Sequence, residues 1–240
     1  MSAVPEGIEY HLPVDISLVM SWIAVLIILV ISWLGTRRLE KVPRGLQNFL
    51  EWGLDIVYKF ADEMVGPTAH KYYPLFSMLF CFILVSNLMG LIPGFISSTS
   101  RLSTTVGLAL VVFFATHYLG IKERGFVPYV KHWFGPVPTW LKPFMFLIEI
   151  ISEIARPVSL SFRLFGNILA KEILLSVLAL LVFIFLPSGN LIQETLSVVP
   201  IVLRPLIILL GLLVSVIQAF VFMILAMVYI GGAVQAHEGH

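Results

Sequence analysis

The stretch Ala155–Glu172, ARPVSLSFRLFGNILAKE, places charged and amide side chains inside a segment that is otherwise apolar. The apolar run that contains it, residues 141–186, is longer than the about 20 residues that a helix needs to cross a bilayer. An arginine near the centre of a membrane helix costs at least about 2.5–3.5 kcal/mol, so such a residue generally faces a partner or a water-filled cavity. The stretch therefore predicts a membrane helix with a functional site in it, centred on Arg163.

The composition of the whole chain is that of an integral membrane protein. Of the 240 residues, 59% are hydrophobic and 12% are charged, and the mean hydropathy is +0.98; about a quarter of the residues of a soluble domain are charged. The formal net charge of +1 argues against nucleic acid as a partner. Cys81 is the single cysteine, which excludes a disulfide framework and a thiol pair for metal or redox chemistry. No cofactor is expected.

Five segments are apolar and long enough to cross a bilayer, so we expect a single all-α membrane domain with five transmembrane helices. The expected helices cover residues 16–35, 75–95, 102–121, 141–186 and 191–235. Residues 44–66 space their apolar side chains at helical intervals with charges opposite, which predicts an amphipathic helix in the membrane interface. A soluble helix that caps the loops is the alternative.

The basic residues predict the orientation of the chain. The acidic residues 1–15 differ from the basic start of a cleavable signal peptide, so we expect the first span to be retained after an external tail. By the positive-inside rule, connections rich in Lys and Arg face the cytoplasm. We therefore expect a bacterial plasma (inner) membrane protein with its N-terminus outside and its C-terminus inside. Ten of the fifteen Lys and Arg residues lie in two connections: Arg37, Arg38, Lys41, Arg44, Lys59 and Lys71, and Lys122, Arg124, Lys131 and Lys142.

The last two apolar segments are unusually long. A helix of roughly 45 residues rises about 65 Å, whereas the hydrocarbon core of a bilayer is about 30 Å thick. Either each segment breaks into shorter helices at Pro157, Pro200 or Pro205, or both helices tilt strongly. The PSGN stretch at 187–190 is expected to join them as a hairpin.

Polar residues recur on one face of the fourth span. They lie within roughly 40° of Arg163 on a helical wheel, whereas Glu172 falls nearly opposite and Lys171 to one side. A structural ion pair of Arg163 with Glu149 or Glu172 is one interpretation, and Arg156 lies where its side chain can snorkel to the membrane surface. A stripe of this length favours an ion path. Its members are Glu149, Ser152, Arg156, Ser159, Arg163 and Asn167.

The last span carries a second stripe, of small, aromatic and amide side chains. Small and hydrogen-bonding residues let another membrane helix approach closely. We expect this face to contact a neighbouring helix. The stripe consists of Gly211, Ser215, Gln218, Phe222 and Tyr229, with Gly232 close by.

Three motifs carry a resemblance to a known family. PVSLSFRLFGNILAKE, at residues 157–172, and VIQAFVFMILAMVYI, at 216–230, closely resemble subunit a of the F-type ATP synthases. SNLMGLIPG, at 86–94, is similar to the second-span signature of that family. The resemblance extends over nearly the whole chain after about Pro13. It implies two long tilted helices that wrap a ring of c subunits.

The resemblance also implies a function and roles for single residues. The subunit would be a stator that forms two offset half-channels against the c-ring, so that proton flow turns the ring and drives ATP synthesis. Its partners would be the c-ring, the peripheral-stalk b subunits, the rest of the synthase and the lipid bilayer. Arg163 matches the essential arginine. Asn87, Asn167, Glu172 and Gln218 match residues of the ion path; Glu149, Ser152, Arg156 and Ser159 are inner half-channel candidates; Gly211, Ser215, Phe222 and Tyr229 are ring-facing candidates.

This chain differs from some members at two positions. Gly90 stands where they carry an acidic residue, and Gly211 stands where they carry a His or Glu that partners the acid matched by Glu172. The chain also has no Gly-rich phosphate loop, so it is not expected to make ATP on its own.

Two other functional classes remain as alternatives. A haem-bearing anchor needs paired histidines at matched depth, and His117 is the only histidine well inside an expected span. A secondary transporter is built from inverted repeats around a central site, and the two halves of the chain show no such similarity.

Overall fold

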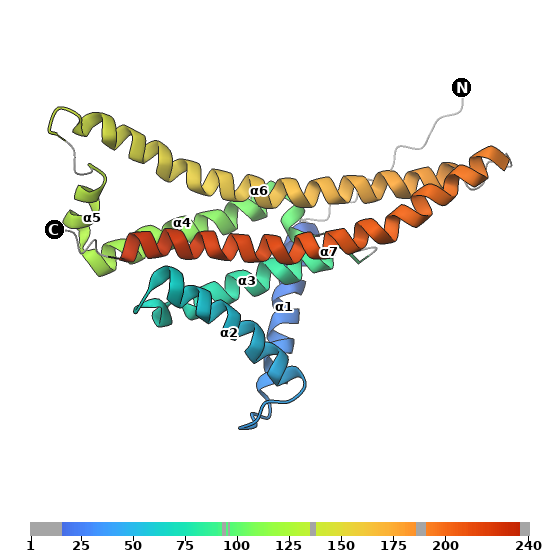
Figure 1. The fold of residues 1–240 in the computed structure, drawn as a ribbon, viewed down its shortest axis with the longest axis horizontal. Coiled ribbons are helices and arrows are strands. Elements are labelled where there is room, and N and C mark those ends of the chain that lie inside the picture. The colour runs from blue at the N-terminus through green and yellow to red at the C-terminus, as the bar shows by residue number, and fades with distance from the viewer. Residues whose placement is uncertain (1–15, 93–94, 96, 135–137, 186–190, 236–240) are drawn as a thin grey trace.

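The computed structural model describes residues 16–92, 95, 97–134, 138–185 and 191–235. Every element in these ranges is helical, which confirms the all-α fold (Figure 1). Two short 3₁₀ turns, η1 (Ala69–Lys71) and η2 (Ser98–Ser100), lie in the connections. The α-helices are α1 (Ile16–Thr36), α2 (Leu46–Val65), α3 (Tyr73–Met89), α4 (Leu102–Arg124), α5 (Phe126–His132), α6 (Lys142–Phe185) and α7 (Leu191–Val234).

The two long helices are continuous. α6 and α7 have 44 residues each, with Pro157 inside α6 and Pro200 and Pro205 inside α7, so each rises about 66 Å. Breakage at these prolines is therefore wrong, and a helix of this length fits a bilayer only if it tilts. Figure 1 shows α6 and α7 running along the long axis of the molecule and meeting at one end. The PSGN stretch expected to join them lies outside the described residues.

Among the residues that the structure describes, four helices are long and apolar enough to cross a membrane: α1, α4, α6 and α7 from Thr195 onward. α3 is apolar but has 17 residues, a rise of about 26 Å. It ends at Met89, where the sequence analysis expected a span to continue to residue 95. The chain folds back at Gly90, since a Cβ atom there would lie 2.7 Å from the Ser97 Cβ. The hydroxyl of Ser97 then donates to the Ser86 carbonyl oxygen at 2.9 Å.

α7 is the central helix of the bundle, because α2, α3, α4 and α6 all pack against it. One part of the core lies where α7 meets α2 and α3, and the other lies where it meets α3, α4 and α6. The first contains Val57, Ala61, Val65, Ala69, Tyr72, Phe76, Met223, Met227, Ile230 and Val234. The second contains Leu79, Ile83, Ala109, Val112, Leu160, Leu164, Ile168, Ala219, Phe222 and Ala226.

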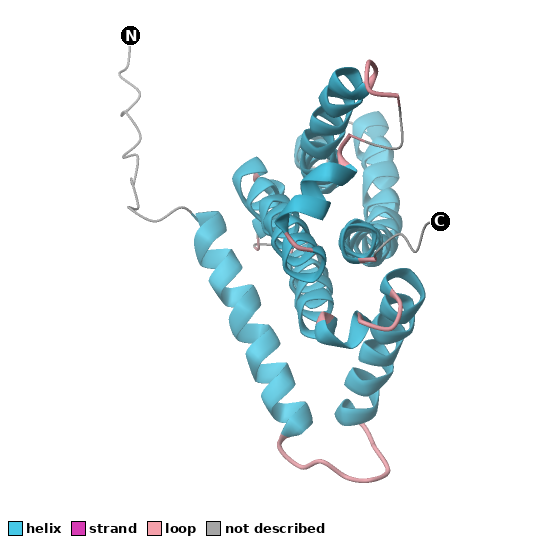
Figure 2. Cartoon of the chain, turned by 90° about the vertical axis from the view of Figure 1, so that its left-hand side faces the viewer, coloured by secondary structure: helices cyan, strands magenta, loops and turns pink. Residues whose placement is uncertain are grey.

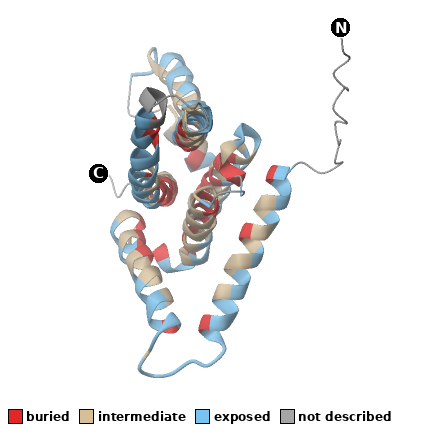
Figure 3. Cartoon of the chain, turned by 90° about the vertical axis from the view of Figure 1, so that its right-hand side faces the viewer, coloured by how far each residue is buried: buried red, intermediate tan, exposed pale blue. Residues whose placement is uncertain are grey.

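α1 and α2 lie at the periphery. α1 packs on α2, α3 and η2 and stands at the edge of the bundle (Figure 2). Figure 3 shows few buried positions on it; they are Ser17, Ala24 and Gly35. The amphipathic α2 begins at Leu46, two residues after the expected start, and buries one face against α7. There a Cβ atom on Gly231 would lie 2.6 Å from the Met64 carbonyl oxygen, so only glycine permits this approach of the two backbones.

Candidate functional site

Arg163 lies on a face of α6 that the other helices leave uncovered. Its side chain is exposed, and it forms no hydrogen bond or ion pair with the described residues. Ser159 and Asn167 are exposed on the same face, and a Cβ atom added to Gly166 would have no neighbour within 4 Å. The structural pair of Arg163 with Glu149 or Glu172 is therefore not formed. The buried Leu160, Leu164 and Ile168 pack an adjacent side of α6, about 60–140° from Arg163 on a helical wheel.

An amide pair connects the two long helices one turn beyond Arg163. The Nδ2 atom of Asn167 donates to Oε1 of Gln218 at 2.9 Å. Gln218 itself is only 4% exposed. Residues that are far apart in sequence are thus brought together beside the exposed guanidinium.

Asn87 is the centre of a buried polar group, which we call the Asn87 cluster: Asn87, Ser97, Thr99, Lys171, Glu172 and Ser215. Asn87 is fully buried. Its Nδ2 donates to the Ser215 carbonyl at 3.4 Å, and its Oδ1 accepts from the Thr99 hydroxyl at 2.9 Å. The Oε1 atom of Glu172 accepts from the Ser97 backbone N–H at 3.3 Å. The cluster therefore joins α3, η2, α6 and α7.

Lys171 is a member of this cluster that the helical wheel did not identify as a site residue. It is 8% exposed, and its Nζ donates to the Asn87 carbonyl oxygen at 3.4 Å. Its aliphatic part packs on Gly211, where an added Cβ atom would lie 2.9 Å from both Lys171 Cδ and Leu91 Cδ2. The absence of a side chain at position 211 thus makes room for the lysine.

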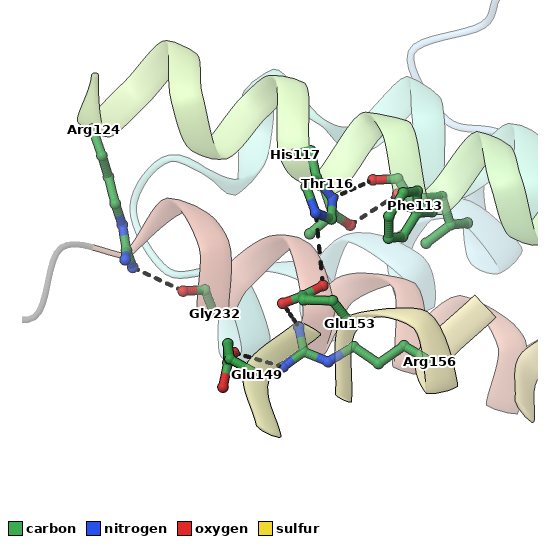
Figure 4. A network of polar contacts seen from close by, with 9 residues as sticks. Phe113, Thr116, His117, Arg124, Glu149, Glu153, Arg156 and Gly232 are labelled. Atoms are coloured by element: carbon green, nitrogen blue, oxygen red, sulfur yellow. Dashed lines mark hydrogen bonds and ion pairs between the residues drawn. The ribbon is translucent and has the colours of Figure 1, made fainter. Parts of the chain in front are cut away.

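A second polar group lies near the other end of the bundle, and we call it the Glu153 cluster: His117, Glu149, Glu153 and Arg156 (Figure 4). Arg156 Nη1 donates to Oε1 of Glu153 at 2.7 Å, and Arg156 Nη2 lies 3.9 Å from Oε1 of Glu149. The other oxygen of Glu153 lies 3.8 Å from Nε2 of His117. Arg156 also lies over the ring of Tyr229, 5.4 Å from its centre. Arg156 is thus held by partners in its own chain, so snorkelling is not needed to explain it.

Glu153 was missed because it lies off the polar stripe. Ten residues separate it from Arg163 in the sequence, which places it about 80° away on a helical wheel. There it faces α4, where it meets His117. A histidine in the third span was the available signal, but the sequence analysis considered it only as a haem ligand.

A cavity of about 350 Å³ opens beside the Glu153 cluster. Of the four inner half-channel candidates, Glu149 and Arg156 line it, Ser152 is half-buried outside it, and Ser159 lies on the exposed face of α6. Burial raises the pKa of the Tyr129 phenol, which therefore stays neutral in the wall of the cavity. The full lining is Thr116, Arg124, Tyr129, Trp133, Glu149, Glu153, Arg156, Val228, Tyr229, Gly232 and Ala233.

Most of the ring-facing candidates on α7 are covered by this chain. Ser215 is 2% exposed, Phe222 is 1% exposed, and Gly211 is buried against Lys171 and Leu91. Tyr229 is half-buried beneath Arg156. The stripe on α7 therefore contacts other helices of the same chain. The side chains that α7 leaves exposed are mostly apolar and include Leu206, Leu209, Leu210, Leu213 and Ile217.

Comparison with known proteins identifies the family of the chain. Residues 18–231 match the family described as "ATP synthase A chain". The chain belongs to this family. It is 42% identical over 224 residues to ATP synthase subunit a of Trichlorobacter lovleyi, an alignment that covers 93% of this chain and 88% of the relative. It is 41% identical over 220 residues to ATP synthase subunit a of Geobacter sulfurreducens, covering 92% of this chain and 87% of the relative.

Family membership confirms the resemblance found in the motifs. The F-type ATP synthase subunit a family and the apolar helices together make the chain an integral membrane protein. A haem anchor and a secondary transporter, the two other classes considered from the sequence, are therefore wrong.

Proposed function

We propose that the chain is the proton-translocating stator subunit of an F-type ATP synthase and forms two offset half-channels against a ring of c subunits. One observation carries this proposal: Arg163 is exposed and unpaired among the described residues, on a helix that bears a polar cluster on each side of it. Along the helix axis, Arg156 of one cluster lies about 10 Å from Arg163 and Glu172 of the other about 14 Å away in the opposite direction. The two clusters are therefore offset, as two half-channels require.

The guanidinium of Arg163 would control where a carboxyl group of the c-ring can be ionised. A protonated carboxyl group on a c subunit can face lipid at low cost, whereas an unpaired carboxylate in hydrocarbon is costly. A nearby positive charge favours the carboxylate, so the ionised form is tolerated only beside Arg163. Arginine stays protonated at any accessible pH, whereas a buried lysine can lose its proton. The fixed cation would also prevent protons from passing directly between the half-channels.

The Asn87 cluster is our candidate for the outer half-channel. Asn87, Glu172 and Gln218 would pass an entering proton to a ring carboxylate near Arg163, and Lys171 would border this path. The buried hydrogen bonds of Asn87 and the contact of Gln218 with Asn167 support this assignment. Each proton that crosses a potential of about 100 mV supplies about 2.3 kcal/mol to the rotation.

The 350 Å³ cavity is our candidate for the inner half-channel. It lies at the end of α4 that carries the basic residues Lys122 and Arg124, and the positive-inside rule assigns such an end to the cytoplasm. The same reasoning supports an external N-terminus and a cytoplasmic C-terminus. A proton carried around by the ring would leave through the cavity, past Glu149 and Arg156.

The contact with the ring is assigned to the exposed face of α6 rather than to the buried stripe of α7. Ser159, Gly166 and Ala170 are small and exposed, and they flank Arg163 on this face. Small residues allow close approach of a partner helix, which would bring a ring carboxylate to the guanidinium. The b subunits and the rest of the synthase would complete the assembly, and nucleotide chemistry would belong to those other parts.

Substitution of Arg163 tests this proposal. In inverted membrane vesicles that contain the assembled complex, Arg163→Ala is expected to reduce ATP-driven proton pumping by about 100-fold, because an ionised ring carboxylate without its guanidinium partner costs about 2.5–3.5 kcal/mol at the centre of the membrane. Arg204→Ala is a matched control, since Arg204 is also exposed on a long helix, and it should keep pumping near the wild-type rate. Normal pumping by an assembled Arg163→Ala complex would contradict the proposal.

A further inference from the structure

We infer that His117 and Glu153 together hold one exchangeable proton at the inner end of the ion path and pass it to the cytoplasmic cavity. The pair would act between the ring and the cytoplasmic cavity. The inference rests on the proposed function, because it adds a proton-carrying pair to the inner half-channel.

The hydrogen bonds of His117 determine which of its nitrogens faces Glu153. Nδ1 lies 2.9 Å from the Phe113 carbonyl oxygen. A carbonyl oxygen only accepts hydrogen bonds, so Nδ1 carries the proton of a neutral ring. The unprotonated Nε2 then points at Oε2 of Glu153, 3.8 Å away (Figure 4). Two lone pairs would face each other, and a proton on either atom removes the repulsion.

The charges around the pair favour the uptake of one proton. Glu149, Glu153 and Arg156 form linked ion pairs with a formal net charge of −1, which one further proton neutralises. Arg156 is already bonded to Oε1 of Glu153 at 2.7 Å, so Oε2 is left for His117.

The remaining titratable groups of the cavity wall are two phenols and the positively charged Arg124. On α5 and α7, Tyr129 and Tyr229 line the same cavity as Glu153, and a neutral phenol adds no charge. On α4 itself, Nη2 of Arg124 donates to the carbonyl oxygens of Gly232 and Gln235. Nε2 of His117 and Oε2 of Glu153 are the facing atoms of this cluster that one added proton would join.

Glu153 lines two spaces of different size, and Thr116, Arg156 and Tyr229 line both of them as well. One space is the 350 Å³ cavity. The other has about 10 Å³ and also touches Pro157 and Leu160, and its volume is close to the smallest that holds a water molecule. Leu160 lies one helical turn before Arg163. Because Glu153 lines both spaces, a proton that moves from the small space to the cavity can bind to its carboxylate on the way.

The transfer needs no reactant other than water. A proton that arrives through the small space forms an O–H bond with Glu153 or an N–H bond with Nε2 of His117, and the net charge of the cluster rises by one. That bond breaks when a water molecule in the cavity accepts the proton, and the cluster returns to its original charge. No electrons are exchanged with any other group.

The test measures passive proton flow through the membrane sector of the assembled complex, in vesicles stripped of the nucleotide-hydrolysing part. Flow is recorded while the pH on the cytoplasmic side is varied between about 5 and 8, where histidine titrates. In wild type, the proton flow plotted against this pH should have the shape of a titration curve. His117→Gln should remove this curve and lower the flow about threefold or more at neutral pH. Glu153→Gln should also change the curve, because the carboxylate that faces Nε2 of His117 is then absent.

His70→Gln provides the matched control. The Nδ1 atom of His70 lies 3.1 Å from the Pro67 carbonyl oxygen, as that of His117 does from Phe113. His70 differs in being exposed and in having no ion pair with a carboxylate of the described residues. This variant should keep the wild-type profile. The inference is overturned if His117→Gln and Glu153→Gln both keep that profile. It is also overturned if either variant assembles and changes the proton flow by the same factor at every pH. If Arg163→Ala behaves as expected while these variants do not, the proposed function stands and this inference alone fails.

Discussion

The Asn87 cluster and the Glu153 cluster lie on opposite sides of Arg163 and solve different physical problems. In the Asn87 cluster, Asn87, Ser97 and Thr99 are fully buried and bonded to one another or to backbone atoms. In the Glu153 cluster, side chains of opposite charge meet at the wall of a 350 Å³ cavity. Buried polar atoms must keep their hydrogen bonds because water cannot replace them, whereas charges beside water are partly screened.

The comparison shows what each cluster contributes. The Asn87 cluster, which is closed to water, holds α3, η2, α6 and α7 in place, so substitutions in it should lower stability first. The Glu153 cluster, which is open to the cavity, contributes less to stability, so substitutions in it should change proton flow first. The following three predictions test this difference, from the largest expected effect on stability to the smallest.

Asn87→Ala should have the largest effect. The substitution removes the Asn87 acceptor of the Thr99 hydroxyl, which keeps only the Ser97 hydroxyl at 2.8 Å, and it leaves a small void at a fully buried position. Together these changes cost about 3 kcal/mol. The contact from Lys171 goes to the backbone oxygen and is retained. The check is the temperature at which half of the purified complex loses its integrity, together with the amount assembled in the membrane.

Ser215→Ala is the matched control for Asn87→Ala. Ser215 is equally buried, but its hydroxyl bonds only to the Gly211 carbonyl of its own helix, at 2.7 Å. Loss of this local bond should cost about 1 kcal/mol or less. Equal losses in the two variants would mean that the network between helices does not stabilise the closed cluster.

Gly211→Ala should have the next largest effect, again in the closed cluster. The new methyl group would lie 2.9 Å from Lys171 Cδ and from Leu91 Cδ2, and such overpacking costs about 1–2 kcal/mol. Lys171→Ala removes one of the two clashes, so the double variant should be more stable than the sum of the single losses predicts. Strictly additive losses, measured by the same thermal assay, would show that Lys171 does not occupy the space above Gly211.

The sequence predicted the overall arrangement because long apolar runs and helical periodicity determine it. The bounds of α6 and α7 differ by at most one residue from the expected segments, and Ser159, Arg163 and Asn167 do share one exposed face. A helical wheel gives relative angles along one helix, but it does not say which of its faces a neighbour covers. For that reason the stripe on α7 was expected to face a partner, although it is covered by this chain.

The residues that the sequence analysis missed depend on contacts between distant segments. Glu153 has a role because α4 places His117 opposite it, and Lys171 because α7 has a glycine beside it. Ser97 and Thr99 lie in a short polar connection that looks like an ordinary exposed turn, yet both are fully buried. Such contacts depend on how the helices pack, which the local pattern of one segment does not contain.

Arg156→Gln should have the smallest effect on stability and so tests the open cluster. Its side chain is 33% exposed, whereas that of Glu153 is 9% exposed. Glutamine keeps an N–H donor for the buried carboxylate, so the loss should be about 1 kcal/mol or less. Two carboxylates would then lie at the cavity wall without their guanidinium, which should slow ATP-driven pumping in vesicles. Lys59→Gln, which breaks an exposed pair with Asp55 on α2, should change neither stability nor pumping. If Arg156→Gln instead destabilised the complex as much as Asn87→Ala, the two clusters would have the same structural role, and water in the cavity would not be screening the inner charges.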